Sequence, residues 1–189
     1  MGGISVSLGL KPNIVELVDH DFEWKKLANE TIQRLWEIFG SLAKDIQHIG
    51  STSIQNIRAK PIIDIAVAIE DFETFYSLIP TLESNGFMYR GWFIEERSMV
   101  LNVYKKLELE DNRVNTHYIH IEKMGSNEWH DHINFRNYLN AHPAVAKTYE
   151  AIKIKLAAEN AYDEGRKKYG AGKNDFIKKT LQDAVVWLQ

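Results

Sequence analysis

The chain has 189 residues, of which 44% are apolar and 26% charged, and its formal net charge is −3 at pH 7. These values fit one globular domain with its own hydrophobic core, and they provide no overall basic field to attract nucleic acid or an anionic membrane. The chain contains no cysteine, which excludes disulfides, thiolate metal sites and cysteine nucleophiles and favours a cytoplasmic protein. No apolar run reaches the roughly 20 residues of a membrane span, so no membrane partner is expected.

The first half of the chain alternates between helical and extended patterns. Apolar residues recur near helical spacing after Asp19 and Asp21, either of which could cap a helix. The run PIIDIAVAI is apolar and β-branched, as in a central strand. Asp71 is a typical helix cap and Gly86 a typical helix end. We therefore expect a helix at 19–42, strands at 45–50 and 61–69, and a helix at 71–86.

The second half of the chain is expected to begin with strands and to end with helices. Strands are expected at 87–93, 98–107 and 115–125, and helices at 126–142, 143–161 and 172–189. This order predicts an α+β fold, in which a mixed sheet is covered by helices and the C-terminal part is helical. We expect a single domain over residues 1–189, sheet-rich over about 14–125 and helical over about 126–189.

The most informative segment is HIGSTSIQNIRAKPIIDIAVAI, residues 48–69, where a Gly-Ser turn directly follows a strand. The backbone N–H groups of such a turn suit an anion such as phosphate, particularly if a helix follows. Candidate phosphate or ligand contacts are therefore Gly50 and the hydroxyls of Ser51, Thr52 and Ser53. His48 ends the preceding strand, where it would either donate to the ligand or bond the backbone as a core histidine.

A single carboxylate, Asp64, interrupts the apolar strand that follows, thirteen residues after Ser51. A carboxylate beside a phosphate site is a common way to hold Mg²⁺, which prefers oxygen ligands and substrate phosphates. A Gly-Ser turn followed at this distance by an acid resembles the core of the nucleotidyltransferase superfamily. That pattern normally has a second acid two positions further on, where this chain has Ala66. Alternatively, Asp64 is a structural charge paired with Lys60 or Arg58.

A third set of candidates lies in the predicted strand at 115–125, where His120 and Glu122 share one face. If that strand neighbours the strand of Asp64, the three side chains would form a mixed histidine and carboxylate site. We expect Asp64, His120 and Glu122 to be the catalytic residues of such a site, with Asp64 and Glu122 as the ligands of Mg²⁺. The pair His130 and His132 points about 200° apart on a helix, so these two side chains are not expected to share an ion.

Two basic residues are candidates for neutralising phosphate charge. Lys60 precedes Pro61, which favours an extended backbone, and Arg136 lies in a predicted helix with a guanidinium that can bind phosphate through two N–H groups. The alternatives are an exposed lysine and a structural ion pair. Lys173, in GAGKND, does not belong to a P-loop, because Lys167 stands where that motif needs glycine.

Several segments together resemble the signature of the GrpB family, and the resemblance covers nearly the whole chain. They are DHDFEW, HIGSTSI with AKPIIDI, HYIHIEKMGSNEW, FRNYLNAHPAVAKTYEAIKIKLA and YGAGKNDFIKKTL. This chain departs from the family pattern at Asn56, in a loop where relatives usually have Pro-Gly, and at Tyr118, where many relatives have histidine. Asn56 can adopt a positive φ more readily than most residues, so the loop is expected to survive.

The resemblance implies a nucleotidyltransferase-like fold, usually with one acid in the strand of Asp64. It also implies a link to nucleotide or coenzyme A chemistry, because some family members are fused to dephospho-CoA kinase. The first hypothesis is an Mg²⁺-dependent nucleotidyl transferase that binds a nucleotide or phosphometabolite. The second is a non-catalytic binder of the same ligands, which Ala66 favours. The third is an accessory protein that binds a partner through exposed apolar residues on its C-terminal helices. A nucleic-acid partner is not expected.

Overall fold

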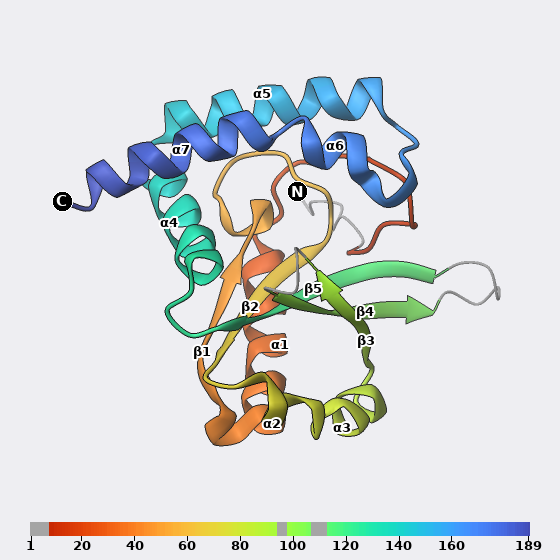
Figure 1. Cartoon of the computed structure of the whole chain (residues 1–189). Helices are drawn as coiled ribbons and strands as arrows, with labels where there is room; N and C mark the ends of the chain where they lie inside the picture. The colour runs from red at the N-terminus through yellow and green to blue at the C-terminus, as the bar shows by residue number, and fades with distance from the viewer. Residues whose placement is uncertain (1–7, 94–97, 107–112) are drawn as a thin grey trace.

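The computed structural model describes residues 8–93, 98–106 and 113–189, and Figure 1 shows the arrangement of their elements. Five strands form one sheet in the order β1-β2-β5-β4-β3. They are β1 (Ala43–Ile49), β2 (Ile63–Ile69), β3 (Phe87–Phe93), β4 (Ser98–Lys106) and β5 (Arg113–Lys123). The central strands β2 and β5 run parallel, and every other neighbouring pair in the sheet is antiparallel. A mixed sheet covered by helices confirms the predicted α+β class.

The first helix, α1 (Glu23–Phe39), covers one face of the sheet. Its start is fixed as the sequence predicts, because the Asp21 carboxylate accepts a hydrogen bond of 2.9 Å from the N–H of Glu23. Leu35 and Phe39 of α1 belong to the main core together with the isoleucines and the valine of β2. Burial of this apolar surface is the main favourable term in folding.

The predicted helix at 71–86 is instead two short helices, α2 (Phe72–Tyr76) and α3 (Ile79–Ser84). Asp71 caps the first as expected, since its carboxylate accepts from the N–H groups of Glu73 and Thr74. Pro80 explains the break, because proline has no N–H to donate to the carbonyl four residues earlier and its ring clashes there. The expectation of one continuous helix was therefore wrong.

Helices dominate the chain after the last strand. They are α4 (Asn127–Ala141), α5 (Pro143–Glu159), α6 (Lys167–Ala171) and α7 (Asn174–Trp187). Side chains on alternate sides of β2 pack against different helices: Ile65 belongs to the core with α1, whereas Ala66 and Ala68 contact Trp129 of α4. The helix α4 therefore lies on the sheet face opposite α1. A second apolar cluster joins α4 to α5 and α7.

The segment before α1 contacts both the sheet and the C-terminal helical part. Leu10 forms an isolated bridge with Asn115 of β5, and Ile14 forms one with Tyr162. The guanidinium of Arg166, which lies just before α6, donates to the carbonyl of Ile14 over 2.9 Å. The segment before α1 is thereby tied both to the central sheet and to the connection between α5 and α6. None of the described helices combines the length and the apolar character that a membrane crossing requires.

Candidate functional site

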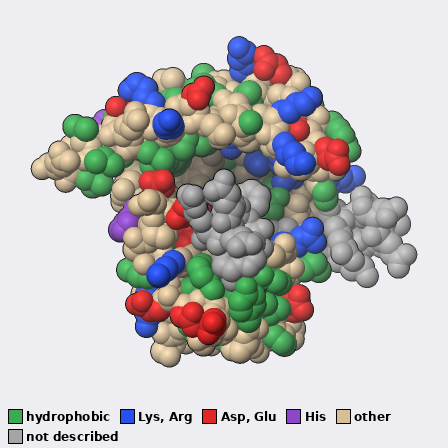
Figure 2. All heavy atoms as spheres, viewed as in Figure 1, with side chains coloured by type: hydrophobic (Ala, Val, Ile, Leu, Met, Phe, Trp, Pro, Cys, Tyr) green, Lys and Arg blue, Asp and Glu red, His purple; other side chains and the backbone are tan. Residues whose placement is uncertain are grey.

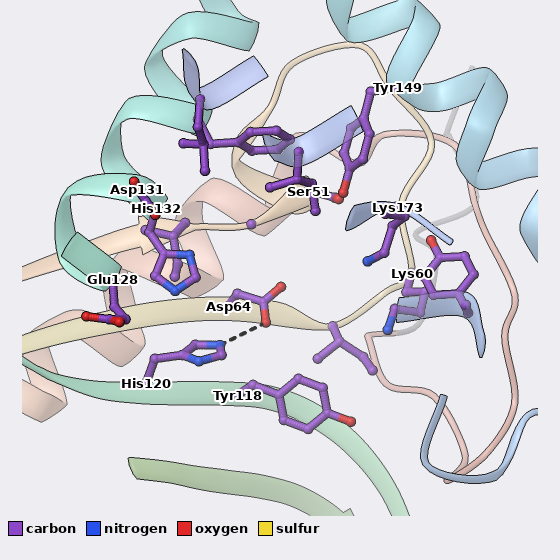
Figure 3. Close-up of a pocket in the computed structure, with 17 residues that line it drawn as sticks. Ser51, Lys60, Asp64, Tyr118, His120, Glu128, Asp131, His132, Tyr149 and Lys173 are labelled. Atoms are coloured by element: carbon purple, nitrogen blue, oxygen red, sulfur yellow. Dashed lines mark hydrogen bonds and ion pairs between the residues drawn. The ribbon is translucent and has the colours of Figure 1, made fainter. Parts of the chain in front are cut away.

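A cavity of about 360 Å³ lies between the α4 face of the sheet and the C-terminal helices. Figure 2 shows the surface hollowed below these helices, and Figure 3 shows the side chains that line the cavity. Its wall is largely apolar with a few converging polar groups, which is typical of small-molecule sites. Five of the ten candidate site residues from the sequence line it: Gly50, Ser51, Lys60, Asp64 and His120.

Asp64 and His120 meet because β2 and β5 are parallel neighbours, which is the condition on which the mixed site depended. The register pairs Asp64 with Tyr118, and Oδ1 of Asp64 lies 3.4 Å from Nε2 of His120. Burial opposes ionisation of Asp64, but the hydrogen bond from His120 and the nearby charge of Lys60 outweigh it and lower the pKa of the carboxyl group. Arg58, the other sequence-predicted partner, instead pairs with an aspartate outside the cavity.

Gly50 brings the backbone turn directly against the Asp64 carboxylate. Its φ of 68° lies in the left-handed region that favours glycine. A Cβ at this position would collide with the side chain of Asp64. Glycine is therefore required twice over, by the turn and by the close approach of the turn to the acid.

The hydroxyls that follow Gly50 have different roles. Ser51–Ser53 forms only one 3₁₀ turn, so no long helix dipole reinforces an anion at this place. Nε2 of His48 is hydrogen-bonded to Oγ1 of Thr52 at 2.9 Å, and Oγ of Ser53 donates to the carbonyl of Gly50 over 2.6 Å. Burial lowers the pKa of His48 to about 4, so this imidazole is neutral at pH 7. Ser51 is the hydroxyl residue of this turn that lines the cavity.

Arg136 of α4 lies behind the turn rather than in the lining of the cavity. Its Nη1 donates to the side-chain oxygen of Gln47 over 2.9 Å and to the carbonyl of His48 over 2.8 Å. These contacts tie α4 to the end of β1. The acceptors are neutral, so these bonds give Arg136 a structural role but are not the ion pair that was the alternative to a phosphate contact.

Two lysines, Lys60 and Lys173, lie together on one side of Asp64 (Figure 3). Their Nζ atoms are 5.2 Å and 4.7 Å from the ring centroid of Tyr169. Burial is the main cause that lowers the pKa of Lys60 to about 7, and the positive charges of Arg166 and Lys173 lower it further. The sequence excluded a P-loop at Lys173 but did not predict that this lysine lies in the cavity. Only the fold brings Lys173 next to Lys60.

On the other side of Asp64, sequence reasoning missed His132 of α4. Its Nε2 lies 3.0 Å from Oε1 of Glu122, a carboxylate that is 1% exposed. His120, Glu122 and His132 each offer one ligand atom, and all three atoms lie within 4.8 Å of one another. Burial opposes protonation of His132, but the hydrogen bond and charge of Glu122 outweigh it and raise the pKa of the imidazole.

A periodicity in α4 could have identified His132. Trp129 and Ile133 face the sheet, and His132 is three residues after Trp129, so it lies near the same face. His130 lies one residue after Trp129 and is exposed. The two histidines do point apart, as predicted, but one of them points into a site.

The arrangement limits how Mg²⁺ could be held. Ala66 occupies the position of the second acid, is fully buried, and packs in one cluster with Trp129. Glu122 of β5 stands beside Ala68 of β2 in the register. Ala68 is four residues after Asp64, so the backbone positions of Glu122 and Asp64 are about 13 Å apart along the strand direction. Asp64 therefore fits one Mg²⁺ that arrives with ligand phosphates, whereas the described residues of β2 hold no second carboxylate for a two-metal site.

The sequence is similar to proteins of one family. The model of the family described as GrpB protein matches residues 14–183. The glutamate-rich protein GrpB of Alkalihalophilus pseudofirmus is 34% identical over 178 residues, which cover 93% of this chain and 99% of that protein. The UPF0157 protein YqkA of Bacillus subtilis is 32% identical over 92% of this chain and 48% of its own length.

Two solved structures relate the fold to known architectures. The crystal structure of GrpB from Enterococcus faecalis matches with a TM-score of 0.78 and 32% identity, and covers 92% of this chain and 99% of that one. The Cid1 poly(U) polymerase with MgGTP bound matches with a TM-score of 0.50 and 12% identity, over 76% of this chain and 44% of that one. The second likeness is one of fold alone, and it supports the nucleotidyltransferase-like architecture that the sequence predicts.

Proposed function

This chain belongs to the GrpB family, and we propose that it binds a nucleotide or another phosphorylated metabolite in the cavity between the sheet and the C-terminal helices. The observation that carries the proposal is the convergence of the Gly50–Ser51 turn, two lysines and the Asp64 carboxylate in one cavity. Lysine ammonium groups and turn N–H groups are common phosphate donors. The cysteine-free sequence favours the cytoplasm, where such ligands occur.

In this proposal the phosphates lie between Asp64 and the pair Lys60 and Lys173. Ser51 donates its hydroxyl, and the two ammonium groups neutralise phosphate charge. The aromatic rings of the wall, which include Phe135 and Tyr149, provide apolar surface for the rest of the ligand. Mg²⁺, when bound, would be held by Asp64 and the ligand phosphates and would neutralise charge on the transferred group.

We propose nucleotidyl transfer as the reaction, and binding without turnover as the second candidate. The buried Ala66 favours the second candidate, because the strand offers one carboxylate where two-metal transfer uses at least two. Both candidates require ligand binding. Nucleotidyl transfer moves the nucleoside monophosphate to an acceptor and releases pyrophosphate, so an assay for pyrophosphate release from each bound nucleoside triphosphate, with water, dephospho-CoA or CoA as the acceptor, separates them. The release is expected only for the first.

The third hypothesis, an accessory protein, predicts exposed apolar residues on the C-terminal helices. The end of α7 has such residues at Val185, Val186 and Trp187. These residues are consecutive, but nothing among the described residues shows what would cover them, so this feature alone does not favour the accessory hypothesis over the cavity.

The test is a thermal-shift panel of nucleoside triphosphates, dephospho-CoA and CoA, each with and without Mg²⁺ or Mn²⁺. A ligand at 100 times its dissociation constant adds about 2.7 kcal/mol of stability, or roughly 5 to 10 °C for a chain of this size. We expect a shift with at least one ligand, and Asp64→Asn is expected to remove the part that depends on metal. Glu70→Gln, an exposed carboxylate just after the same strand, is the matched control.

The result that would overturn the proposal is an absence of any shift across the panel with well-folded protein. A shift that survives unchanged in Asp64→Asn would keep ligand binding but remove the role assigned to this carboxylate. Circular dichroism of the variant checks that its fold is intact.

A further inference from the structure

The cluster of His120, Glu122 and His132 has features that phosphate binding does not use. His120 and Glu122 lie two residues apart on β5 and so share a face, and His132 reaches them from α4. The rings of the two histidines are 5.3 Å apart between centroids. Both histidines line the cavity, whereas Glu122 lies buried behind them.

The second oxygen of the Glu122 carboxylate is unsatisfied. Oε1 lies 3.0 Å from His132, but among the residues that the structure describes none hydrogen-bonds Oε2, although the side chain is buried. A buried polar atom without a hydrogen-bond partner destabilises the folded state, and a charged one does so more strongly. Such an atom in a native structure is a common sign of an ion or a water molecule.

We propose that His120, Glu122 and His132 bind a divalent transition-metal ion of the Zn²⁺ type, at a site distinct from any Mg²⁺ that accompanies a nucleotide. Two imidazole nitrogens and one carboxylate oxygen suit Zn²⁺, Co²⁺, Fe²⁺ or Ni²⁺, whereas Mg²⁺ prefers oxygen ligands alone. The three ligand atoms, now within 4.8 Å of one another, need to approach to about 3 to 3.5 Å for metal bonds of about 2.0 to 2.2 Å. Small rotations of the side chains are enough.

The surroundings favour a cation. Glu128 and Asp131 of α4 line the same end of the cavity, and Asp64 lies against the imidazole of His120 (Figure 3). Carboxylates around a metal-binding imidazole orient its ring and increase its basicity. The side of the ion that faces the cavity would be open to a ligand, as in catalytic rather than structural sites. The proposal does not depend on nucleotide binding.

The experiment titrates Zn²⁺ and, separately, Co²⁺ and Mg²⁺ into the chelator-treated full chain without nucleotide, by calorimetry and by the visible absorption of Co²⁺. We expect one equivalent of Zn²⁺ or Co²⁺ per chain and no binding of Mg²⁺ at the same concentrations. His132→Ala is expected to weaken Zn²⁺ binding by at least about ten-fold, since even outer partners of metal ligands change affinity by 10- to 100-fold. Glu122→Gln is expected to do the same.

His130→Ala is the matched control, because His130 is an exposed histidine two residues away on the same helix. The His130→Ala variant is expected to bind Zn²⁺ with the same affinity as the unchanged protein. The proposal is overturned if the chain takes up no stoichiometric Zn²⁺ or Co²⁺, or if His130→Ala loses as much affinity as His132→Ala. If Glu122→Gln fails to fold, His132→Ala decides the result, because that side chain is partly exposed. Thermal shifts with nucleotide in the presence of chelator test the nucleotide proposal separately.

Discussion

At the scale of single residues, Asp64 shows how an apolar strand accommodates a charge. Its neighbours Ile63 and Ile65 point into the core with α1, whereas its own side chain points to the cavity. There it meets the imidazole of His120, and Lys60 stabilises its ionised form. The strand therefore tolerates one carboxylate because alternate side chains face opposite layers.

Lys60 leads to a prediction for pH. Burial lowers its pKa to about 7, so the ammonium form that attracts an anionic ligand is mostly present at pH 6 and mostly lost at pH 8. We expect the affinity for the nucleotide with the largest thermal shift to fall as pH rises across this range, by up to about ten-fold. Isothermal titration calorimetry at pH 6, 7 and 8 measures the change.

Lys60→Arg is the control for this prediction, because a guanidinium remains charged throughout the range. The ligand's own titration affects both proteins equally, so the comparison isolates Lys60. Parallel pH profiles for the two proteins would contradict a role of the Lys60 charge in binding.

At the scale of elements, α4 positions more of the site than any motif in the sequence suggests. It carries His132, Asp131 and Glu128, and Trp129 holds it against the sheet. The helix begins after Gly125, whose φ of 74° turns the chain out of β5, and Ser126 caps it. Two adjacent residues, Gly125 and Ser126, therefore determine where α4 begins against the sheet.

The cap of α4 is expected to contribute measurably to stability. Oγ of Ser126 accepts a hydrogen bond of 3.3 Å from the N–H of Trp129, one of the groups that a helix start leaves unpaired. Ser126→Ala is expected to lower the free energy of unfolding by about 1 kcal/mol, measured by urea denaturation. Asn127→Ala changes an exposed neighbour without a cap bond and is expected to stay within about 0.5 kcal/mol of the unchanged protein. Equal losses in the two variants would show that the cap bond has no role.

At the scale of the whole molecule, Arg166 connects three parts of the chain. It donates to the carbonyls of Lys11 and Ile14 before α1, and its Nη1 donates to the hydroxyl of Tyr118 on β5. The guanidinium thus joins the beginning of the described chain, the sheet and the C-terminal helices. Tyr118 also lines the cavity, so this connection supports one wall of the site.

Replacement of Arg166 is expected to be strongly destabilising. Arg166→Met leaves the three acceptors without this charged donor, and each such bond contributes about 1.5 to 3 kcal/mol. We expect a loss of at least about 3 kcal/mol and a melting temperature lower by roughly 6 to 12 °C. Lys168→Met, an exposed lysine two residues further on, is the control for loss of a positive charge. Similar melting temperatures of the two variants would contradict the connecting role.

The local part of the fold could be predicted from the sequence, because each signal acts over a few residues. Asn56 adopts a φ of 59°, as its position in the loop predicts, and the strand that contains Asp64 lies centrally in the sheet. The prediction failed at Pro80, where the pattern of apolar residues continues but the hydrogen-bond ladder cannot.

The amino-acid sequence was enough to predict the α+β class, the Gly50 turn and the exceptional position of Asp64, since periodicity and turn chemistry are local properties. The family followed from the resemblance of several segments to its signature. The meeting of distant side chains, such as Lys60 with Lys173 and Glu122 with His132, was evident only in the folded chain. Periodicity states which face of an element a side chain occupies, but not which element packs on that face. That choice depends on the shapes of packed surfaces, here on small alanines of β2 that leave room for Trp129 of α4.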